Sequence, residues 1–159
     1  MRKREEITGV HVWLVLWKAY RALQEHASAS IEATGLGTSD FAALEALLHK
    51  GPLPVNAIAE KVFLTSGSMT AAVDRLESKG LVHRTADASD RRTRVVHLTP
   101  KGEALIASAF KDHAAALERA VEGLSQAERA EVIRLLKKLG KGAEGKLVTG
   151  SSRGSPRSM

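Results

Sequence analysis

Hydrophobic residues at helical spacing begin close to the start of the chain. Between residues 5 and 33 they recur every three or four positions, which predicts a long helix. The apolar positions are Ile7, Val10, Trp13, Leu14, Trp17, Tyr20 and Leu23. Between Val10 and Trp17 they lie on more than one face, so this helix is expected to be buried on two sides. Its own domain can cover one side, and the other needs a further partner.

Turn signals separate this helix from two shorter ones. Residues 35–37, Gly-Leu-Gly, interrupt the pattern. Either Thr38 or Ser39 is then expected to cap a second helix, which Gly51-Pro52 ends. Pro54 opens a short third helix.

A fourth helix and two extended segments come next. The helix is predicted from about residue 66 to residue 79, and Gly80 follows at the position where glycine commonly ends helices. Residues 81–84 and 94–98 are short apolar runs on either side of a polar, charged link, which predicts a hairpin with a long exposed tip. Residues 39–98 therefore have the order of a helix-turn-helix followed by a β-wing.

Two more helices and a tail complete the pattern. Thr99-Pro100 is a cap followed by proline at the first helical position, and residues 125–128, Ser-Gln-Ala-Glu, form a capping box for the last helix. The folded part is expected to end near Gly140, because the last 18 residues contain four Gly, four Ser and one Pro. That composition is typical of a flexible tail. The apolar stripes of the flanking helices exceed what the central lobe can cover, which predicts a two-fold dimer.

The predicted fold is mainly α with a small β-wing, namely a winged helix-turn-helix flanked by N- and C-terminal dimerisation helices. The expected division is an N-terminal dimerisation helix with its linker (1–38), a DNA-binding lobe (39–99), C-terminal dimerisation helices (100–141) and a tail (142–159).

Composition narrows the chemistry. The 159 residues include no cysteine, which excludes disulfide scaffolds, Cys-ligated zinc, iron–sulfur clusters and thiol catalysis. Lys and Arg exceed Asp and Glu by 24 to 18, giving a net charge of +6, which favours a polyanionic partner. The longest unbroken apolar run, Val12 to Trp17, is far shorter than a membrane span, so no membrane partner is expected and the protein is predicted to be intracellular.

The fourth helix has features of a DNA recognition helix. Small hydroxyl residues and a glycine gather at its start, where bulky side chains would prevent close approach to base edges and phosphates. The candidate contacts on and beside this helix are Thr65, Ser66, Gly67, Ser68, Thr70 and Arg75. Taken alone, the same pattern also fits an ordinary solvated, well-capped helix.

The tip of the predicted wing strengthens the DNA-binding hypothesis. Residues 84–94 contain four Arg and two Asp. Paired arginines on a hairpin tip suit the narrow, negative minor groove, and Asp90, with Asp87, is expected to hold them by charge-assisted bonds. The candidate wing contacts are Asp90, Arg91, Arg92 and Arg94. The alternative is a solvated charged loop, which fits less well once helix and wing stand in this order.

These segments together resemble a known family. Residues 64–70 (LTSGSMT), 73–84 (VDRLESKGLVHR), 90–92 (DRR) and 96–102 (VHLTPKG) are similar to those of the MarR family of bacterial transcriptional regulators. The resemblance implies a dimeric winged-helix protein, usually a repressor, that binds pseudo-palindromic operators in double-stranded DNA. It also implies that a small, often aromatic ligand releases the DNA, from a site between the dimerisation helices and the DNA-binding lobe. Members that sense oxidants through cysteine are not a match.

Several side chains could line a ligand site. His11, Trp13, Trp17 and Tyr20 offer stacking surfaces and polar atoms on the first helix, although packing in a dimer core explains them better. His83 and His97 lie on the two predicted strands and could face each other, but surface histidines are the favoured interpretation, and neither a metal nor a cofactor is expected. Residues 140–145 match G-x-G-x-x-G without the strand and helix that a dinucleotide site requires.

The sequence thus predicts a cytoplasmic, homodimeric DNA-binding transcriptional regulator, a repressor released by a small, aromatic ligand. One alternative is a constitutive or architectural DNA-binding protein without a ligand switch. A second is a winged helix that binds another protein. An enzyme has little support, because no nucleophile–base pair or metal triad is indicated.

Overall fold

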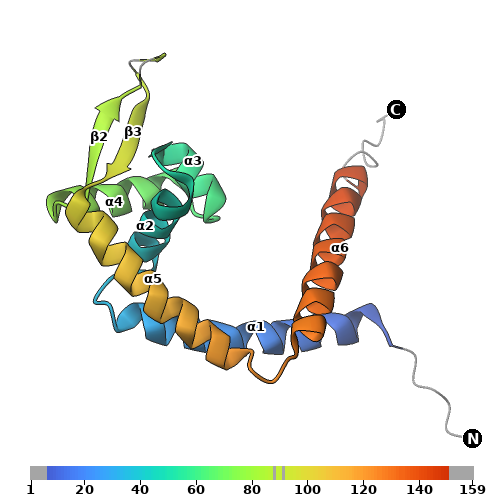
Figure 1. The fold of residues 1–159 in the computed structure, drawn as a ribbon. Helices are drawn as coiled ribbons and strands as arrows, with labels where there is room; N and C mark the ends of the chain where they lie inside the picture. The colour runs from blue at the N-terminus through green and yellow to red at the C-terminus, as the bar shows by residue number, and fades with distance from the viewer. Residues whose placement is uncertain (1–6, 88, 91, 151–159) are drawn as a thin grey trace, which may run out of the picture. The chain divides into compact units, whose positions relative to one another are not determined.

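A computed structural model describes residues 7–87, 89, 90 and 92–150, with side chains as far as residue 146. The described elements are six helices and three short strands (Figure 1). They are α1 (Gly9–Glu32), α2 (Thr38–Lys50), β1 (Leu53–Pro54), α3 (Val55–Lys61), α4 (Ser66–Ser78), β2 (Val82–Ala86), β3 (Arg94–Leu98), α5 (Pro100–Ala120) and α6 (Gln126–Gly150). This order confirms the predicted mainly α fold with a small wing. The chain divides after Ala120 into two compact units.

The hydrophobic core lies in the first unit, between α2, α3, α4, the sheet and α5. Its largest fully buried side chains are Phe41, Leu44, Ile58, Met69, Val73, Leu76, Val82, Val96 and Ile106. Burying each contributes about 1.5–3 kcal/mol. Helix α4 supplies Met69, Val73 and Leu76 to this core from one face.

The wing is part of a three-stranded antiparallel sheet in the order β1-β3-β2. Strand β2 pairs with β3 along its whole length, from Val82 opposite Leu98 to Ala86 opposite Arg94. The sequence predicted these two strands but missed β1, which pairs Leu53 with Val96. A strand of two residues is too short to show the alternating pattern by which strands are recognised.

Side-chain caps set where several helices begin. The Thr65 hydroxyl accepts a hydrogen bond from the Ser68 amide at the start of α4. Before α6, the predicted capping box forms, with the Ser125 amide donating to the Glu128 carboxylate at 2.8 Å. One expected cap is wrong: α2 begins at Thr38 and its cap is Gly37, without a side-chain bond. Glycine is itself a favoured cap, so a hydroxyl next to it was not needed.

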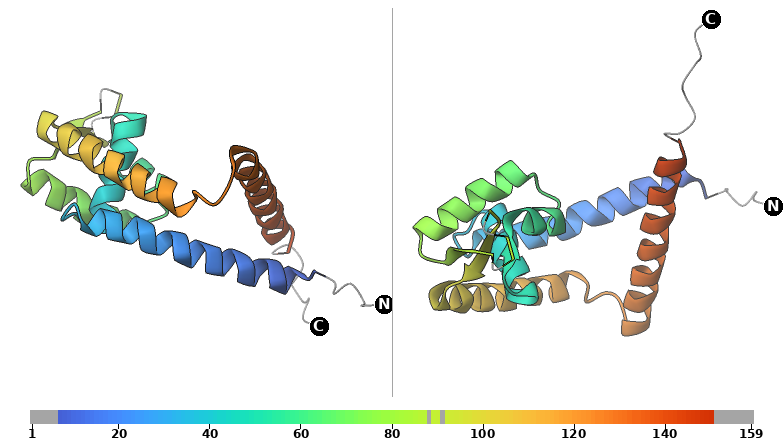
Figure 2. Two further views of the ribbon diagram at one scale, coloured as in Figure 1. Left: turned by 60° about the horizontal axis from the view of Figure 1, so that its bottom comes forward. Right: turned by 90° about the horizontal axis from the view of Figure 1, so that it is seen from above.

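Helix α1 packs along α5 (Figure 2). The Ser30 hydroxyl and His113 Nδ1 are 2.7 Å apart, and His113 is buried against the ring of Phe41. Nearer its N-terminus α1 is exposed, and 63% of the Trp13 surface is accessible. Burial of this helix on two sides is therefore not achieved within one chain.

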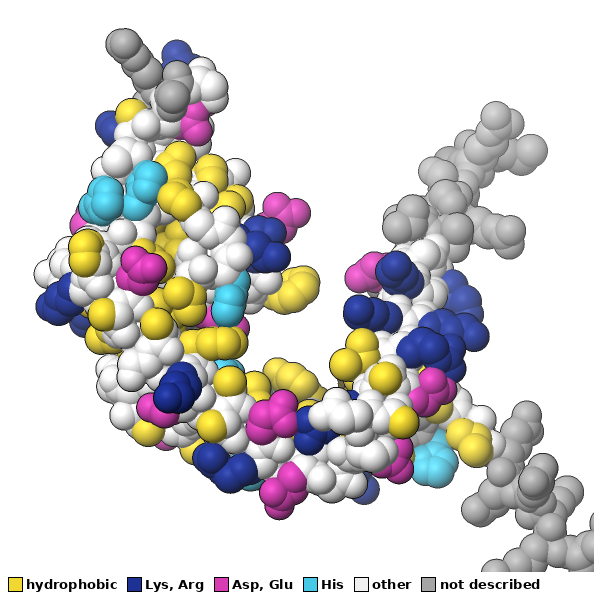
Figure 3. All heavy atoms as spheres, in the orientation of Figure 1, with side chains coloured by type: hydrophobic (Ala, Val, Ile, Leu, Met, Phe, Trp, Pro, Cys, Tyr) yellow, Lys and Arg dark blue, Asp and Glu magenta, His cyan; other side chains and the backbone are white. Residues whose placement is uncertain are grey.

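The second unit consists mainly of α6, which extends to Gly150, ten residues past the end predicted near Gly140. Lysine, alanine and glutamate between its glycines favour a helix, and no proline interrupts it, so the cost of about 1 kcal/mol per glycine does not end it. Of the predicted tail, residues 142–150 are thus helical, and residues 151–159 lie outside the described part. Apolar and basic side chains lie side by side on the surface of α6 (Figure 3).

Within the described residues, no helix is both long enough and apolar enough to cross a membrane.

Gly102 is the place where the fold requires a glycine for space. A Cβ at this position of α5 would overlap the backbone carbonyl of Leu81, just before β2. We expect Gly102→Ala to lower the free energy of unfolding by about 1–3 kcal/mol, as overpacking does. Denaturant unfolding measures this. The control is Gly140→Ala in α6, where a Cβ meets nothing within 4 Å and the helix should gain stability. Equal stability of Gly102→Ala and the unaltered protein would contradict the packing described here.

Candidate nucleic-acid interface

The first turn of α4 presents small groups to solvent. The side chains of Thr65, Ser66, Ser68 and Thr70 are all exposed. The Thr65 hydroxyl donates to Ser68 Oγ at 2.9 Å, and Thr70 Oγ1 donates to the Ser66 carbonyl at 2.8 Å. The space above Gly67 is open to 4 Å. A helix start with this shape lets a polyanion approach the free backbone amides closely.

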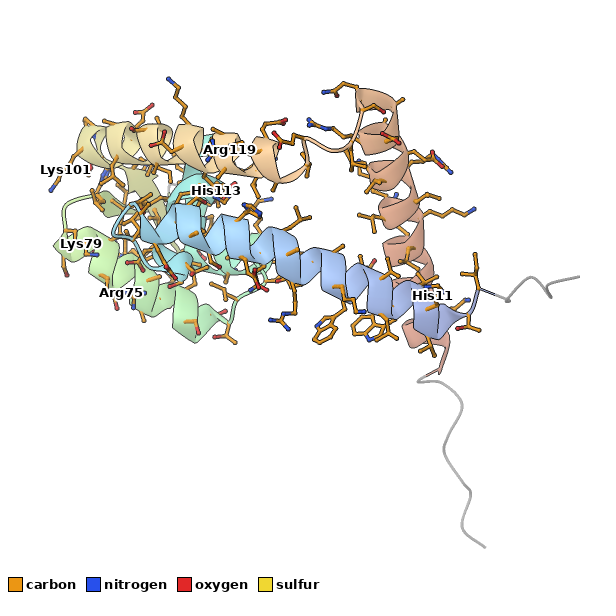
Figure 4. All side chains as sticks on the ribbon, turned by 90° about the horizontal axis from the view of Figure 1, so that it is seen from below. His11, Arg75, Lys79, Lys101, His113 and Arg119 are labelled. Atoms are coloured by element: carbon orange, nitrogen blue, oxygen red, sulfur yellow. The ribbon has the colours of Figure 1, made fainter. Side chains whose placement is uncertain are left out.

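Arg75 joins α4 to α2 through a buried carboxylate. Asp40 is only 2% exposed, and its Oδ1 accepts from Arg75 Nη2 at 2.6 Å and from Nε at 3.2 Å. Arg75 Nη2 also donates to Ser39 Oγ, and Lys79 Nζ lies 3.7 Å from Asp40 Oδ2. Figure 4 labels Arg75 on α4 and Lys79 at the end of this helix. The hydrogen bond to Asp40, and then the charge of that carboxylate, raise the pKa of Arg75.

The sequence predicted Arg75 as a DNA contact and did not single out Asp40. In the structure Arg75 anchors α4 to α2, while half of its side chain stays exposed. The available signal for Asp40 was a charged residue next to Phe41 in the first turn of α2. An acidic residue there is also what a helix dipole favours, so nothing in this segment pointed to a buried ion pair.

Arg84 joins the wing to α4 in the same way. From β2, its Nη1 contacts Glu77 Oε2 at 2.5 Å and its Nη2 contacts Asp74 Oδ1 at 2.6 Å, while its amide donates to Glu77 Oε1. Partial burial disfavours the charged form, but the hydrogen bonds to Asp74 and Glu77 outweigh it and raise the pKa of Arg84. The wing and the recognition helix are thereby fixed to each other.

Two carboxylates shape the wing tip by accepting hydrogen bonds from its backbone and hydroxyl groups. Asp87 Oδ1 accepts from the Ser89 amide and hydroxyl and from the Asp90 amide. Asp90 accepts from the Arg92 amide at 3.0 Å and from the Thr93 hydroxyl. We expected these carboxylates to hold arginine side chains. The bonds described for them go to backbone amides and hydroxyls, because a tight turn leaves such donors unpaired.

The remaining wing candidates are placed in part. Arg92 and Arg94 are exposed. Arg91 lies outside the described residues.

The carboxylate of Asp87 has a lowered pKa. The hydrogen bonds from the Ser89 hydroxyl, and then from the Ser89 and Asp90 amides, lower it from the ordinary 3.8. Its turn-forming bonds are therefore present at neutral pH, and they disappear only when the pH falls below that value and through the lowered pKa.

The two histidines on the wing strands do face each other. His83 and His97 are register partners, and their rings stack with centroids 5.0 Å apart. His97 Nε2 also lies 2.8 Å from the Thr85 hydroxyl. Among the described side chains, no group of three or more His, Asp or Glu is placed to hold a metal ion.

The candidate ligand residues His11, Trp13, Trp17 and Tyr20 are all exposed on α1. The guanidinium of Arg21 lies 5.6 Å from the centre of the Trp17 ring. Two shallow surface hollows occur elsewhere, one between α2 and α3 beside His49 and one on α6 beside Lys138. Neither hollow is lined by the α1 candidates.

This fold and interface define a winged helix-turn-helix DNA-binding protein. The family model of the MarR family matches residues 37–93, the segment from α2 to the wing. The HTH-type transcriptional regulator MhqR of Bacillus subtilis is 39% identical over 136 residues, which are 86% of this chain and 94% of that relative. The chain therefore belongs to the MarR family, and it is a DNA-binding transcriptional regulator of that family.

Solved structures agree with this assignment. The transcriptional regulator BldR from Sulfolobus solfataricus is 28% identical, with a TM-score of 0.71 over 87% of this chain and 99% of BldR. Bordetella bronchiseptica BpsR, 24% identical, shares the fold with a TM-score of 0.71 over 88% of this chain and 98% of BpsR.

The Arg84 network is expected to matter for stability. Arg84→Met leaves Asp74 and Glu77 side by side without their cation, and we expect a loss of about 1–2 kcal/mol in the free energy of unfolding. The matched control is Arg134→Met, which removes an arginine–carboxylate pair of similar length from an exposed face of α6 and should cost less. Urea titrations of the two variants compare the losses. A loss from Arg84→Met no larger than that from Arg134→Met would refute the anchoring role.

Proposed function

We propose that this protein is a homodimeric transcriptional repressor that binds a pseudo-palindromic operator and releases it when a small, aromatic ligand binds. The observation that carries the proposal is the arrangement of α4 and the wing. Arg75 and Arg84 fix both elements, and the exposed first turn of α4 and the exposed Arg92 are left for a partner.

Each protomer would use two kinds of contact. The first turn of α4, with Ser66, Gly67, Ser68 and Thr70, would enter the major groove and contact base edges and phosphates. The wing, with Arg92, Arg94 and Arg91, would follow the flanking minor groove, where guanidinium groups are attracted by the narrow, negative interior. Asp90 would act indirectly, by shaping the turn that carries Arg92.

The uncovered apolar surfaces support a dimer. On α1, Val10, Trp13 and Trp17 are among the exposed large apolar side chains, and α6 contributes Ile133 and Leu136. Exposed large apolar residues gathered on each of these helices are typical of a protein–protein interface. Residues 1–38 and 100–141 would thus assemble the dimer, and residues 39–99 would bind DNA. Two-fold symmetry would place two recognition helices about 34–36 Å apart, one turn of DNA.

Aromatic and polar side chains on α1 support the proposal that a ligand releases the DNA. His11, Trp13, Trp17 and Tyr20 would complete a pocket only when a second protomer covers them. BpsR, with the same fold, is a protein whose DNA binding is regulated by 6-hydroxynicotinic acid. A ligand would act through higher affinity for a dimer in which the spacing of the helices no longer fits DNA. A dimer core without a cavity would favour the constitutive alternative.

Two further statements complete the proposal. The protein is not an enzyme, because the relatives it matches are transcriptional regulators. It works in the cytoplasm, where bacterial chromosomal DNA lies.

Salt dependence should separate the two kinds of DNA contact. Arg92→Ala should weaken binding to all duplexes. It should also lower the slope of log affinity against log salt concentration by about one for each phosphate that the arginine neutralises. In a symmetric dimer this decrease is doubled, because both protomers lose the contact. Ser68→Ala should instead change the preferred sequence, by up to ~1–3 kcal/mol at the affected positions, with the slope little altered. Fluorescence anisotropy with specific and random duplexes at several salt concentrations measures both. The wing assignment fails if Arg92→Ala changes neither affinity nor slope on any duplex.

The dimer is tested by mass in solution. Sedimentation equilibrium at micromolar concentration should give twice the chain mass of 17.1 kDa. Trp13→Glu, which places a charge on the exposed stripe of α1, should shift the equilibrium toward the monomer. A well-folded monomer of the unaltered protein at these concentrations would end the dimer hypothesis.

A further inference from the structure

Phe63 lies in the turn between α3 and α4 in a conformation that phenylalanine avoids. Its φ is +56°, in the left-handed region, and it is the one described non-glycine residue with a positive φ. For a bulky L-residue this conformation is unfavourable, and glycine or asparagine is the usual choice. Phe63 is also 95% exposed, so burial within the chain does not offset that cost.

The turn itself does not require the phenyl ring. Its hydrogen bonds are made by the backbone: the Phe63 amide donates to the Glu60 carbonyl, and the Leu64 amide donates to the Ala59 carbonyl at 3.0 Å. A glycine or asparagine would make the same bonds at lower conformational cost. An aromatic side chain kept in a strained, fully exposed position points to a contact made outside the chain.

The position of Phe63 identifies that contact. Ser66, the first residue of α4, follows three positions later, so the two Cα atoms are at most about 10 Å apart. The major groove is about 12 Å wide. With the start of α4 in the groove, the ring of Phe63 is within reach of its edge.

We propose that Phe63 is a specificity-determining residue that packs on the C5-methyl group of a thymine in each half-site. A phenyl ring has no donor or acceptor for a base edge, and the thymine methyl is the apolar group that the major groove displays. This inference rests on the proposed function, because it places α4 in the major groove.

The experiment compares base preferences. The unaltered protein and Phe63→Asn are each used to select duplexes from a random library, and the selected sequences are compared. Asparagine tolerates the left-handed conformation, so Phe63→Asn should unfold at the same temperature as the unaltered protein or a higher one. We expect it to lose the preference for thymine at one position per half-site and to bind the selected duplex about tenfold more weakly. Phe63→Leu, which keeps an apolar side chain, should retain most of the preference.

Deoxyuridine tests the methyl group itself, because it differs from thymidine only by that group. Replacing the thymine in both half-sites should weaken binding of the unaltered protein by about sixteenfold, which is roughly fourfold for each of the two buried methyl groups. The same replacement should leave Phe63→Asn unchanged. Equal losses for both proteins would overturn the proposal.

Three other results would also overturn it. Equal weakening of Phe63→Asn on random and selected duplexes would indicate a contact with the sugar–phosphate backbone. Dissociation of Phe63→Asn into monomers would indicate packing on a second copy of the chain. Unchanged affinity of Phe63→Asn would show that the ring contacts no DNA. In that case the proposed function would still hold, provided that the unaltered protein binds DNA sequence-specifically. Failure of the unaltered protein to select any sequence would overturn the proposed function as well.

Discussion

A single buried carboxylate fixes the position of the recognition helix. Asp40 on α2 is almost without solvent contact, and it is approached by Arg75 of α4 and by Lys79, the residue that follows the end of α4. A buried charge that loses its partner is strongly destabilising, so α4 cannot turn or slide on α2 without cost. Arg84 then fixes the wing to the outer side of the same helix. The two elements proposed to contact DNA, α4 and the wing, are therefore held to each other and to α2.

A second constraint is that the chain has more apolar surface than it can bury alone. The core is completed by α2 to α5 and the sheet, and Ile31 is the one buried residue of α1. The large apolar residues of α1 and α6 remain exposed. In the proposed dimer these surfaces set the spacing between two rigid DNA-binding bodies. A ligand held between dimerisation helices could then change DNA affinity without altering the interface itself.

Most of the fold could be predicted because it rests on local signals. The apolar period of α4, the cap at Thr65 and the capping box at Ser125 depend on neighbouring residues, and all are present. What the sequence missed depends on residues far apart in the chain. Asp40 and Arg75 are 35 positions apart, and no local pattern in either segment indicates that they form an ion pair. The short strand β1 exists only because β3 lies beside it.

The candidate site shows the same division. The exposed start of α4 and the polar wing tip could be predicted from composition and order. The roles of Asp87 and Asp90 could not, because a carboxylate in a turn can bind an arginine or a backbone amide, and geometry decides between them. Phe63 escaped notice because its significance lies in a backbone angle, which the sequence does not display.

Hydroxyl-radical footprinting on a duplex selected by the protein tests the account most directly. Two rigid lobes in a symmetric dimer should protect two patches of DNA related by two-fold symmetry. Their centres should be separated by one helical turn, about 10–10.5 base pairs, or by a whole number of turns, and the flanking minor grooves should be protected more weakly. A single protected patch without a symmetric counterpart, or protection that does not depend on sequence, would contradict it.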